Sequence, residues 1–404
     1  MNCQVCSSKD LYEVLDLGHH PPSDKFLSEK DLEQPEIFYP LKILFCDGCK
    51  LVQLSYVVDP KVLFGESFIY RTGFNNQLKN HFQKMAEGLG KKFSLNGGDL
   101  VIDIGSNDGT LLSFYPKGAK VLGIDPSSVA DIAIQNGIPT IKDFFNLDLA
   151  RKASEEYGKA KIITCNNTFA HVKELGSVVD GVRLLLDDKG VFVTESHYLL
   201  DLVLNLQHSE IYLEHLRYYS LESLINLFKK FGMEVFDAER IESHGGSIRA
   251  FACKKGAYPV SENIQKVLDQ ENRNRLNEKT TLEQFREKVF DNKIKLNLLL
   301  SKIKSEGSKI VGIGAPAKGN TILNFCNIDN TILDYCVEKS DLKIGKYTPG
   351  THIKVVEEAR IFKDQPEYAL LLTWDIKDII IPKLRAAGYK GKFIVPVPEP
   401  KIIE

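Results

Sequence analysis

Short apolar runs alternate with amphipathic stretches through the middle of the chain. Each run has the length of a buried strand, and the four runs cover residues 100–104, 120–124, 161–165 and 190–194. Strands that alternate with helical patterns predict a parallel sheet with helices on both faces. Two further runs, 234–236 and 248–253, flank Gly245-Gly246 and predict an antiparallel hairpin at one edge of this sheet.

The pattern changes in the last third of the chain. From about residue 258 to residue 306, apolar residues such as Leu282, Phe285 and Val289 follow helical spacing with charged residues between them. This predicts one or two long helices that join two domains. Strand–helix alternation then restarts, with runs at 309–314, 333–337, 368–373 and 392–397. We therefore expect a second, smaller α/β domain.

Composition indicates a globular protein. The 404 residues include 52 Lys and Arg against 54 Asp and Glu, and 43% are hydrophobic. A net charge of −2 without a basic cluster argues against a nucleic-acid-binding face. No apolar run approaches the roughly 20 residues that span a bilayer, and the first residues do not resemble a signal peptide. We expect a cytoplasmic protein with reduced cysteines.

Four of the eight cysteines form two pairs near the start of the chain, Cys3-x-x-Cys6 and Cys46-x-x-Cys49. Two such turns can supply the tetrahedral S₄ cage that zinc prefers, and a closed Cys₄ set is typical of structural zinc. The alternative is a pair of redox motifs. The remaining four cysteines lie among apolar residues and are expected to be buried. We expect three domains, which cover residues 1–62, 63–256 and 257–404.

The loop after the first central strand has the features of a nucleoside-binding loop. Asp103, Gly105, Asn107 and Gly109 lie in it, and a glycine loop between a strand and a helix lets a ligand approach the backbone. Asp125 ends the next strand, where a carboxylate can accept hydrogen bonds from a ribose diol. The full dinucleotide fingerprint is absent, and the acidic residues would repel phosphates.

These features favour S-adenosylmethionine, which has a ribose diol and cationic groups but no phosphate. After the third strand, Asp143 offers an acceptor for the adenine amino group and Phe144 offers a ring for the adenine face. Asn167, at the end of the following strand, completes the set of predicted donor-binding residues. The competing interpretation is an ordinary α/β domain with turn glycines.

A second glycine loop, residues 312–320, begins the C-terminal α/β domain. Lys318 lies beside the start of a predicted helix, where it could contact a phosphate, and Asn320 follows it. The alternatives are an exposed lysine at a helix start or a nicotinamide site, with Asp334 or Glu338 near the next strand as a ribose contact.

Polar aromatic residues gather after the strands of the central sheet. Five of the nine histidines fall within residues 167–171, 195–198, 207–220 and 244–249. Histidine is well suited to proton transfer near neutral pH, and parallel sheets bind ligands at the carboxyl ends of their strands. We expect chemistry here, and a second metal site is the competing use.

At this point the chain resembles the nucleotide-sugar C-methyltransferases along essentially its whole length. The shared elements are the Cys₄ module, Tyr70-Arg-Thr72-Gly73, the loop 103–109, Asn167-Thr-Phe-Ala-His171, Tyr212-Leu-Glu214-His215, His244-Gly-Gly-Ser-Ile-Arg249 and Gly314-Ala-Pro-Ala-Lys318-Gly319. The resemblance implies a zinc domain, a Rossmann-like class I methyltransferase domain and a C-terminal Rossmann-like α/β domain. It also implies a 4-keto deoxysugar on deoxythymidine diphosphate, methylated at C-3.

The resemblance also assigns roles to residues. His215 matches the family's proposed base. Tyr212 and His171 match groups near the keto oxygen and the transferred methyl group. Glu214 matches a neighbouring residue of the family's active site. Tyr70 is expected near the sulfonium. The residues expected on the substrate side are His244, Arg249, Lys318 and Asn320. Which of Tyr212, His215 and His171 is the base stays open.

Two other activities compete with this assignment, an NAD-dependent oxidoreductase and an O- or N-methyltransferase of small molecules. A zinc-ribbon nucleic-acid binder is disfavoured by the charge. No interface signature is visible in the sequence, and we expect a monomer or a weak homodimer.

Overall fold

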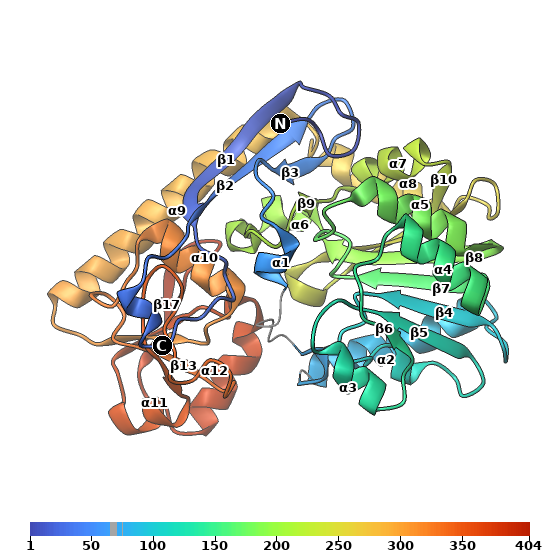
Figure 1. Ribbon diagram of the computed structural model, residues 1–404. Coiled ribbons are helices and arrows are strands. Elements are labelled where there is room, and N and C mark those ends of the chain that lie inside the picture. The colour runs from blue at the N-terminus through green and yellow to red at the C-terminus, as the bar shows by residue number, and fades with distance from the viewer. Residues whose placement is uncertain (65–70, 75) are drawn as a thin grey trace.

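The computed structural model describes residues 1–64, 71–74 and 76–404, without the side chains of Phe74 and His244. Within these residues the chain forms three sheets of four, seven and six strands. Figure 1 shows the seven-stranded sheet in green and cyan, the six-stranded sheet in orange and red, and the three N-terminal strands of the four-stranded sheet in blue above and between them. The predicted class, two Rossmann-like α/β units with a small N-terminal cysteine module, is confirmed.

The seven-stranded central sheet has the order β10-β11-β8-β7-β4-β5-β6. Its strands, in chain order, are β4 (Leu100–Ile104), β5 (Lys120–Ile124), β6 (Thr140–Ile141), β7 (Ala160–Asn166), β8 (Leu186–His197), β10 (Met233–Ile241) and β11 (Ser247–Lys254). Strands β4 to β8 are parallel, and β10 and β11 form the predicted antiparallel hairpin at the edge. Two predicted runs, 100–104 and 120–124, coincide with β4 and β5.

Alternate residues of β4 face two different helical layers. Leu100, Ile102 and Ile104 belong to one buried cluster, and Val101 belongs to another. The second cluster includes the buried face of α2 (Asn76–Lys92). The first includes the buried residues of α4 (Leu147–Tyr157), α5 (Leu175–Leu185) and α7 (Leu221–Lys230). By the same alternation, Asp103 lies on the α2 face.

The N-terminal sheet has the order β1-β2-β3-β9 and is completed by a strand from the central domain. Its strands are β1 (Leu11–His20), β2 (Tyr39–Cys46), β3 (Val52–Leu54) and β9 (Arg217–Tyr218). Val52 pairs with Tyr218 across β3 and β9. The sequence did not predict this pairing, because a two-residue strand leaves no periodic signal. It joins the cysteine module directly to the segment that carries His215.

The C-terminal part begins with two helices, α8 (Glu262–Arg273) and α9 (Lys279–Ser305), in agreement with the predicted helical stretch. The six-stranded sheet follows, with the order β14 (Val355–Glu357), β13 (Cys336–Glu338), β12 (Ile310–Ile313), β15 (Tyr368–Leu371), β16 (Lys392–Val395) and β17 (Lys401–Ile403). Its helices are α10 (Ala317–Cys326), α11 (Ala359–Asp364) and α12 (Lys377–Ala386). The predicted strand 333–337 starts only at Cys336, because the Asp334 carboxylate accepts the Ile310 N–H at 3.2 Å and Leu333 closes a turn onto Asp329.

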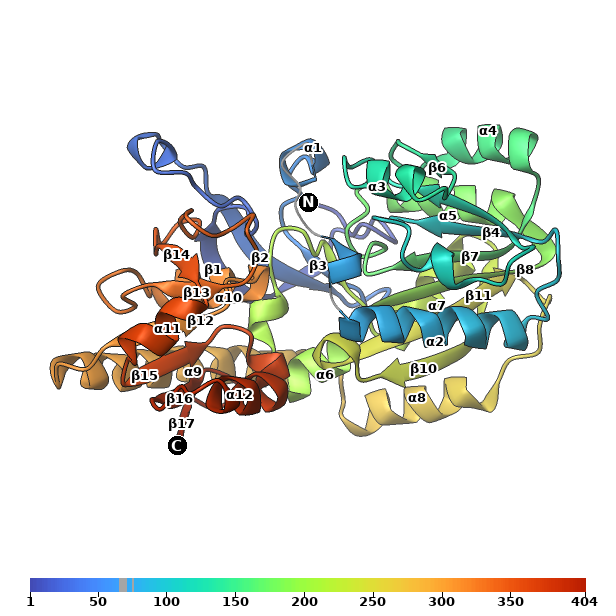
Figure 2. The same ribbon diagram turned by 90° about the horizontal axis from the view of Figure 1, so that it is seen from below.

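Short elements and one long helix connect the three parts. The helices α1 (Pro60–Leu63), α3 (Ala130–Gln135) and α6 (Leu199–Leu204) are short. Figures 1 and 2 both show α9 running along the C-terminal sheet and reaching the N-terminal strands. There the Tyr12 hydroxyl donates to Glu283 of α9 at 2.8 Å. Among the described residues, no helix combines the length and the apolar character needed to cross a bilayer.

Candidate active site

The four predicted cysteine ligands converge on one point. Their sulfur atoms all lie within 4.8 Å of one another, and the pairs Cys3–Cys49 and Cys6–Cys46 are each separated by 3.4 Å. The backbone N–H groups of Val5 and Cys6 point at the Cys3 sulfur, at 3.4 and 3.5 Å. A zinc ion with bonds of about 2.3 Å to sulfur fits four sulfurs at this spacing. No fifth side chain is needed, as expected for a structural site.

The predicted donor loop follows β4 at the carboxyl edge of the central sheet. Gly105 and Gly109 have φ angles of +75° and +77°, a region that L side chains rarely adopt. A Cβ atom at Gly105 would lie 2.2 Å from the Thr168 hydroxyl, and one at Gly109 would lie 2.6 Å from Ile138. Both positions therefore require glycine, because neighbouring side chains approach the backbone too closely for a Cβ atom.

Asp125, after β5, holds this loop in place. One carboxylate oxygen accepts the Asn107 N–H at 2.9 Å, and the other accepts both the N–H and the hydroxyl of Ser127, at 2.8 and 2.5 Å. A carboxylate offers about four lone-pair sites. Three are filled by the protein, so Asp125 can accept one further hydroxyl without displacing a donor.

The predicted Thr72-Gly73 element docks on the same loop. The Asn107 side chain accepts the Thr72 N–H at 2.9 Å, and the Asp108 carboxylate accepts the Gly73 N–H at 2.8 Å. Tyr70 itself lies outside the described residues. Asp103 is buried and accepts the Thr164 hydroxyl at 2.6 Å; burial, together with the nearby Asp125 charge, raises the pKa of Asp103 to about 7.

The remaining predicted donor residues lie at the same edge of the sheet. Asp143 and Phe144 follow β6, and Phe144 is 39% exposed. Asn167 follows β7, has a φ of +52°, and donates its N–H to the Glu195 carbonyl at 2.7 Å. The edge therefore brings these residues together with the donor loop.

Three imidazoles form a cluster beyond the ends of β7 and β8. The ring centre of His215 lies 5.0 Å from that of His171 and 4.6 Å from that of His197. The Tyr212 ring is closer still, with its centre 3.9 Å from that of His215. His197 was not predicted as a site residue. It is the last residue of β8, and it lies beside the predicted residues His171 and His215.

Hydrogen bonding fixes the tautomer of His215. Its Nδ1 lies 2.8 Å from the Glu210 backbone carbonyl, which can only accept a hydrogen bond, so Nδ1 carries the proton. Burial lowers the pKa of His215 well below its usual range, and the His197 and His171 rings lower it further. The neutral ring therefore keeps a lone pair on Nε2, as a general base requires.

The pKa values of Tyr212 and Glu214 are shifted upward, in the opposite direction to that of His215. Burial and the charges of Glu210 and Glu214 raise the pKa of Tyr212 well above its usual range, so the phenol stays protonated and can donate a hydrogen bond. Burial, together with Asp24, raises the pKa of Glu214 to about 7. The Glu214 carboxylate accepts the Ser23 hydroxyl at 2.9 Å.

Arg249, predicted on the substrate side, is bound to a buried carboxylate. Its guanidinium donates twice to Glu195, at 3.1 and 2.9 Å, and Glu195 also contacts His81 of α2 at 2.8 Å and the Ser243 hydroxyl at 2.9 Å. Burial alone would raise the pKa of Glu195, but His81 and Arg249 lower it to about 2. His81 was not predicted from the sequence, because it is one polar residue among several in α2. The His244 side chain lies outside the described residues.

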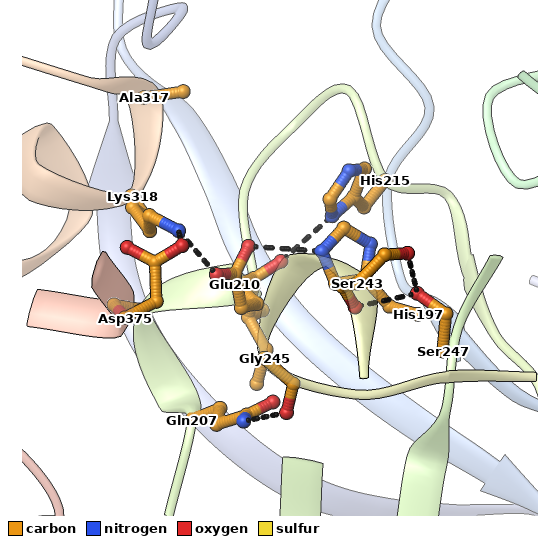
Figure 3. Close-up of polar contacts among 12 residues, drawn as sticks. His197, Gln207, Glu210, His215, Ser243, Gly245, Ser247, Ala317, Lys318 and Asp375 are labelled. Carbon is orange, nitrogen blue, oxygen red and sulfur yellow. Dashed lines mark hydrogen bonds and ion pairs between the residues drawn. The ribbon is translucent and has the colours of Figure 1, made fainter. Parts of the chain in front are cut away.

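Lys318 and Asn320 of α10 approach the site from the C-terminal domain. The Lys318 ammonium contacts Glu210 at 3.1 Å and Asp375 at 2.6 Å (Figure 3). The Asn320 amide donates to the Ser23 carbonyl at 2.7 Å. The site is therefore built from all three parts of the chain.

Three family models each match a different part of the chain. A model of the C-methyltransferase C-terminal domain matches residues 242–398, a zinc binding domain model matches residues 3–64, and a methyltransferase domain model matches residues 78–238. C-methyltransferase NovU of Streptomyces niveus is 31% identical over 405 residues, which cover 99% of this chain and 96% of NovU. The chain belongs to the C-methyltransferase family. The predicted S-adenosylmethionine-dependent C-methyltransferase with a structural zinc site is thereby confirmed at this level.

Solved methyltransferase structures are similar to part of this chain. A methyltransferase from Clostridium acetobutylicum is 13% identical, with a TM-score of 0.34 over 44% of this chain and 92% of its own. Magnesium protoporphyrin IX methyltransferase from Synechocystis is 18% identical, with a TM-score of 0.34 over 44% of this chain and 83% of its own. Scores this low add nothing to the family assignment.

Proposed function

We propose that this C-methyltransferase transfers a methyl group from S-adenosylmethionine to C-3 of a 4-keto deoxysugar carried on a nucleoside diphosphate, with deoxythymidine diphosphate as the expected carrier. The observation that carries the proposal is the pairing of a neutral His215 with a protonated Tyr212, 3.9 Å apart between ring centres. A base beside a hydrogen-bond donor is what the carbon next to a ketone needs in order to become a nucleophile.

In this proposal His215 Nε2 removes the proton from the sugar carbon beside the ketone. The electron pair of that C–H bond then moves toward the ketone oxygen and gives an enolate. The enolate carbon forms the new C–C bond to the methyl group, and the electron pair of the broken S–C bond stays on sulfur, leaving a neutral thioether. A positioned base contributes about 10²–10⁴-fold in rate.

Tyr212 and His171 are the proposed donors to the enolate oxygen. The raised pKa of Tyr212 keeps its O–H group available, and burial lowers the pKa of His171 to about 3, which keeps its ring neutral. A neutral imidazole can donate from one nitrogen without adding a charge beside the base. Each such hydrogen bond can lower the barrier by roughly 3 kcal/mol. Glu214 is the proposed neighbour that completes the polar site.

The donor side follows from the loop after β4. Asp125 has one lone-pair site left for a ribose hydroxyl, Asp103 and the glycine loop face the cationic end, and Asp143 with Phe144 would take the adenine. S-adenosylmethionine supplies an electrophilic methyl group when it is bound. The residues present fit this group, because the loop carries acidic side chains and no arginine or lysine that would select a phosphate.

Arg249 and Lys318 are the two charged residues expected beside the nucleotide part of the substrate. Arg249 remains a proposed substrate contact, although it is ion-paired with Glu195, whereas Lys318 is ion-paired with Glu210 inside the protein. We also expect the enzyme to act in the cytoplasm, where nucleotide-activated sugars would be its substrates.

A labelled methyl donor tests the function directly. The full-length protein is incubated with methyl-labelled S-adenosylmethionine and a panel of 4-keto and 4-hydroxy sugar nucleotides, and the products are read by mass. The expected result is the gain of one methylene unit on a 4-keto sugar, stable to acid, with none on the 4-hydroxy sugars. An acid-labile methyl group, or labelling of the 4-hydroxy sugars, would instead indicate transfer to oxygen.

A further inference from the structure

The C-terminal domain holds three successive residues of the catalytic segment, 209–211, through side chains of α10 and of the turn η6 (Trp374–Ile376). These residues lie in and directly after the turn η4 (His208–Glu210), shortly before Tyr212 and His215. The contacts are Trp374 Nε1 to Ser209 Oγ at 3.1 Å, Lys318 Nζ to Glu210 Oε1 at 3.1 Å, and Thr321 Oγ1 to the Ile211 carbonyl at 3.4 Å.

Glu210 is the point at which these contacts reach the imidazoles. Its side chain is almost fully buried, and its second carboxylate oxygen lies 3.2 Å from Nε2 of His197. Its backbone carbonyl accepts the Nδ1 proton of His215. Figure 3 shows Lys318 on one side of Glu210 and the two imidazoles on the other. A displacement of Glu210 would therefore change the orientation of the His197 and His215 rings and the charge next to them.

The Lys318 ammonium is committed to these contacts. Its side chain is 14% exposed, lies between two carboxylates, and has its nitrogen 5.4 Å from the centre of the Trp374 ring. Moving a buried ammonium away from two carboxylates to meet a phosphate would leave those carboxylates unpaired, which is costly. The geometry thus points to a role inside the protein rather than at the substrate.

Charge balance gives this role a chemical meaning. Among the described residues, the groups that face the two imidazoles are His171 after β7, Tyr212 and Glu210 on the catalytic segment, Tyr218 of β9, and, through Glu210, Lys318 of α10 with Asp375 of η6. With Lys318 in place, the charge of Glu210 is compensated on the side away from the rings. Without Lys318, the uncompensated carboxylate would favour a protonated imidazole.

We propose that Lys318 is a positioning residue, contributed by the C-terminal domain, that acts through Glu210 to keep His215 uncharged and to hold both His197 and His215 in place for proton removal. The proposal rests on the proposed function, since it assumes that His215 is the base. It differs from the sequence-based expectation, in which Lys318 binds the substrate diphosphate.

Three variants in the full-length protein separate these roles. Lys318→Met removes the charge, Lys318→Arg restores it, and Glu210→Gln removes its partner. The matched control is Lys304→Met, because Lys304 of α9 is a partly buried lysine (25% exposed) that pairs with Asp334 at 3.5 Å and not with Glu210. Histidine pKa values are read by NMR on protein labelled at the imidazole carbons, with S-adenosylhomocysteine bound, and kcat and KM are measured across pH.

In Lys318→Met we expect the pKa of one imidazole of the cluster, and the acid limb of kcat, to rise by at least about one pH unit. Lys318→Arg should restore the wild-type limb. In Glu210→Gln the limb should not rise, and adding Glu210→Gln to Lys318→Met should bring it back toward wild type. Lys304→Met should leave the limb unchanged.

Other outcomes overturn the proposal. A higher KM for the sugar nucleotide with unchanged histidine pKa values would place Lys318 at the substrate. Unchanged KM and unchanged pKa values would remove both roles. If Lys318→Met does not fold, Glu210→Gln still decides, because a raised acid limb in that variant contradicts the charge argument. Wild-type protein that shows the predicted titrations but no methyl transfer would refute the proposed function and not this inference.

Discussion

Removing the zinc ion should abolish methyl transfer, although the cysteines do not contact the proposed substrate site. The reason is the shared N-terminal sheet, in which β3 of the cysteine module pairs with β9. The Leu54 N–H also donates to the Leu216 carbonyl at 2.9 Å. Leu216 directly follows His215, so the cysteine module and the proposed base are joined by one ladder of hydrogen bonds.

The expected size of the effect follows from two magnitudes. Structural zinc contributes about 10–16 kcal/mol in zinc-finger peptides, whereas a whole domain is stable by roughly 5–15 kcal/mol. Residues 1–64 should therefore lose their fold without metal, and β9 should lose its partner. A displacement of about 1 Å in an oriented site can cost roughly 100-fold in rate. We expect at least that loss in kcat, with donor affinity nearly unchanged, because the donor loop belongs to the seven-stranded sheet.

Metal analysis, turnover and calorimetry with S-adenosylhomocysteine test this in the same samples. The purified protein should contain about one zinc per chain, and both chelation and Cys46→Ser should remove it together with activity. The matched control is Cys253→Ser, a buried cysteine of β11 outside the cluster. Turnover at the wild-type rate in protein stripped of zinc would refute the coupling through β9, and freshly purified protein without zinc would refute the site itself.

Three further changes are predicted. His215→Ala should lower kcat by about 10²–10⁴-fold while calorimetry shows unchanged S-adenosylhomocysteine affinity; near-normal turnover would place the base elsewhere. Asp125→Ala removes the carboxylate that accepts the N–H groups of Asn107 and Ser127, at about 1–3 kcal/mol for each lost hydrogen bond. The same ligand should therefore bind at least about tenfold more weakly, and an unchanged Kd would contradict this. Burial lowers the pKa of His208 to about 4, against 6.5 for the free side chain. The unfolded chain therefore binds the extra proton, and between about pH 6.5 and pH 5 His208 costs the wild type about 2 kcal/mol. Urea unfolding at both pH values should show His208→Asn gaining that amount relative to wild type, and a constant difference would disprove the assignment.

The sequence predicted the elements whose signal is local. Strands β4 and β5 were located to the residue because strands buried on both faces read as short continuous apolar runs. The four cysteines were correctly predicted to form one cluster, because each Cys-x-x-Cys turn directs two sulfurs to one point. The glycine turn after β4 was located for the same kind of reason, and Gly105 and Gly109 do occupy positions where a side chain would collide with its neighbours; the binding of the donor there stays a prediction.

The parts that the sequence did not reveal depend on contacts between distant segments. Lys318 and Glu210 are 108 residues apart along the chain, and His81 and Glu195 are 114 apart. Neither pair has a periodic or spacing signal, because each residue is an ordinary polar residue in its own segment. Only the packing of the domains shows that Lys318 faces two carboxylates. The expected phosphate contact was a reasonable reading of a helix start and stays untested.

The contacts of residues 208–220 explain why a methyltransferase domain is accompanied by two others. This segment carries the proposed base but has little regular structure of its own, with one turn at His208–Glu210 and the two-residue strand β9. Loops hold side chains accurately only when rigid elements support them. The zinc module supports the segment through β9, and the C-terminal domain supports it through residues 209–211. Glu214 is supported by Ser23, whose hydroxyl donates a hydrogen bond to it. The backbone carbonyl of Ser23 in turn accepts a hydrogen bond from Asn320 of the C-terminal domain. Proton removal from carbon demands a base fixed in distance and direction, and here that precision is supplied from outside the methyltransferase domain.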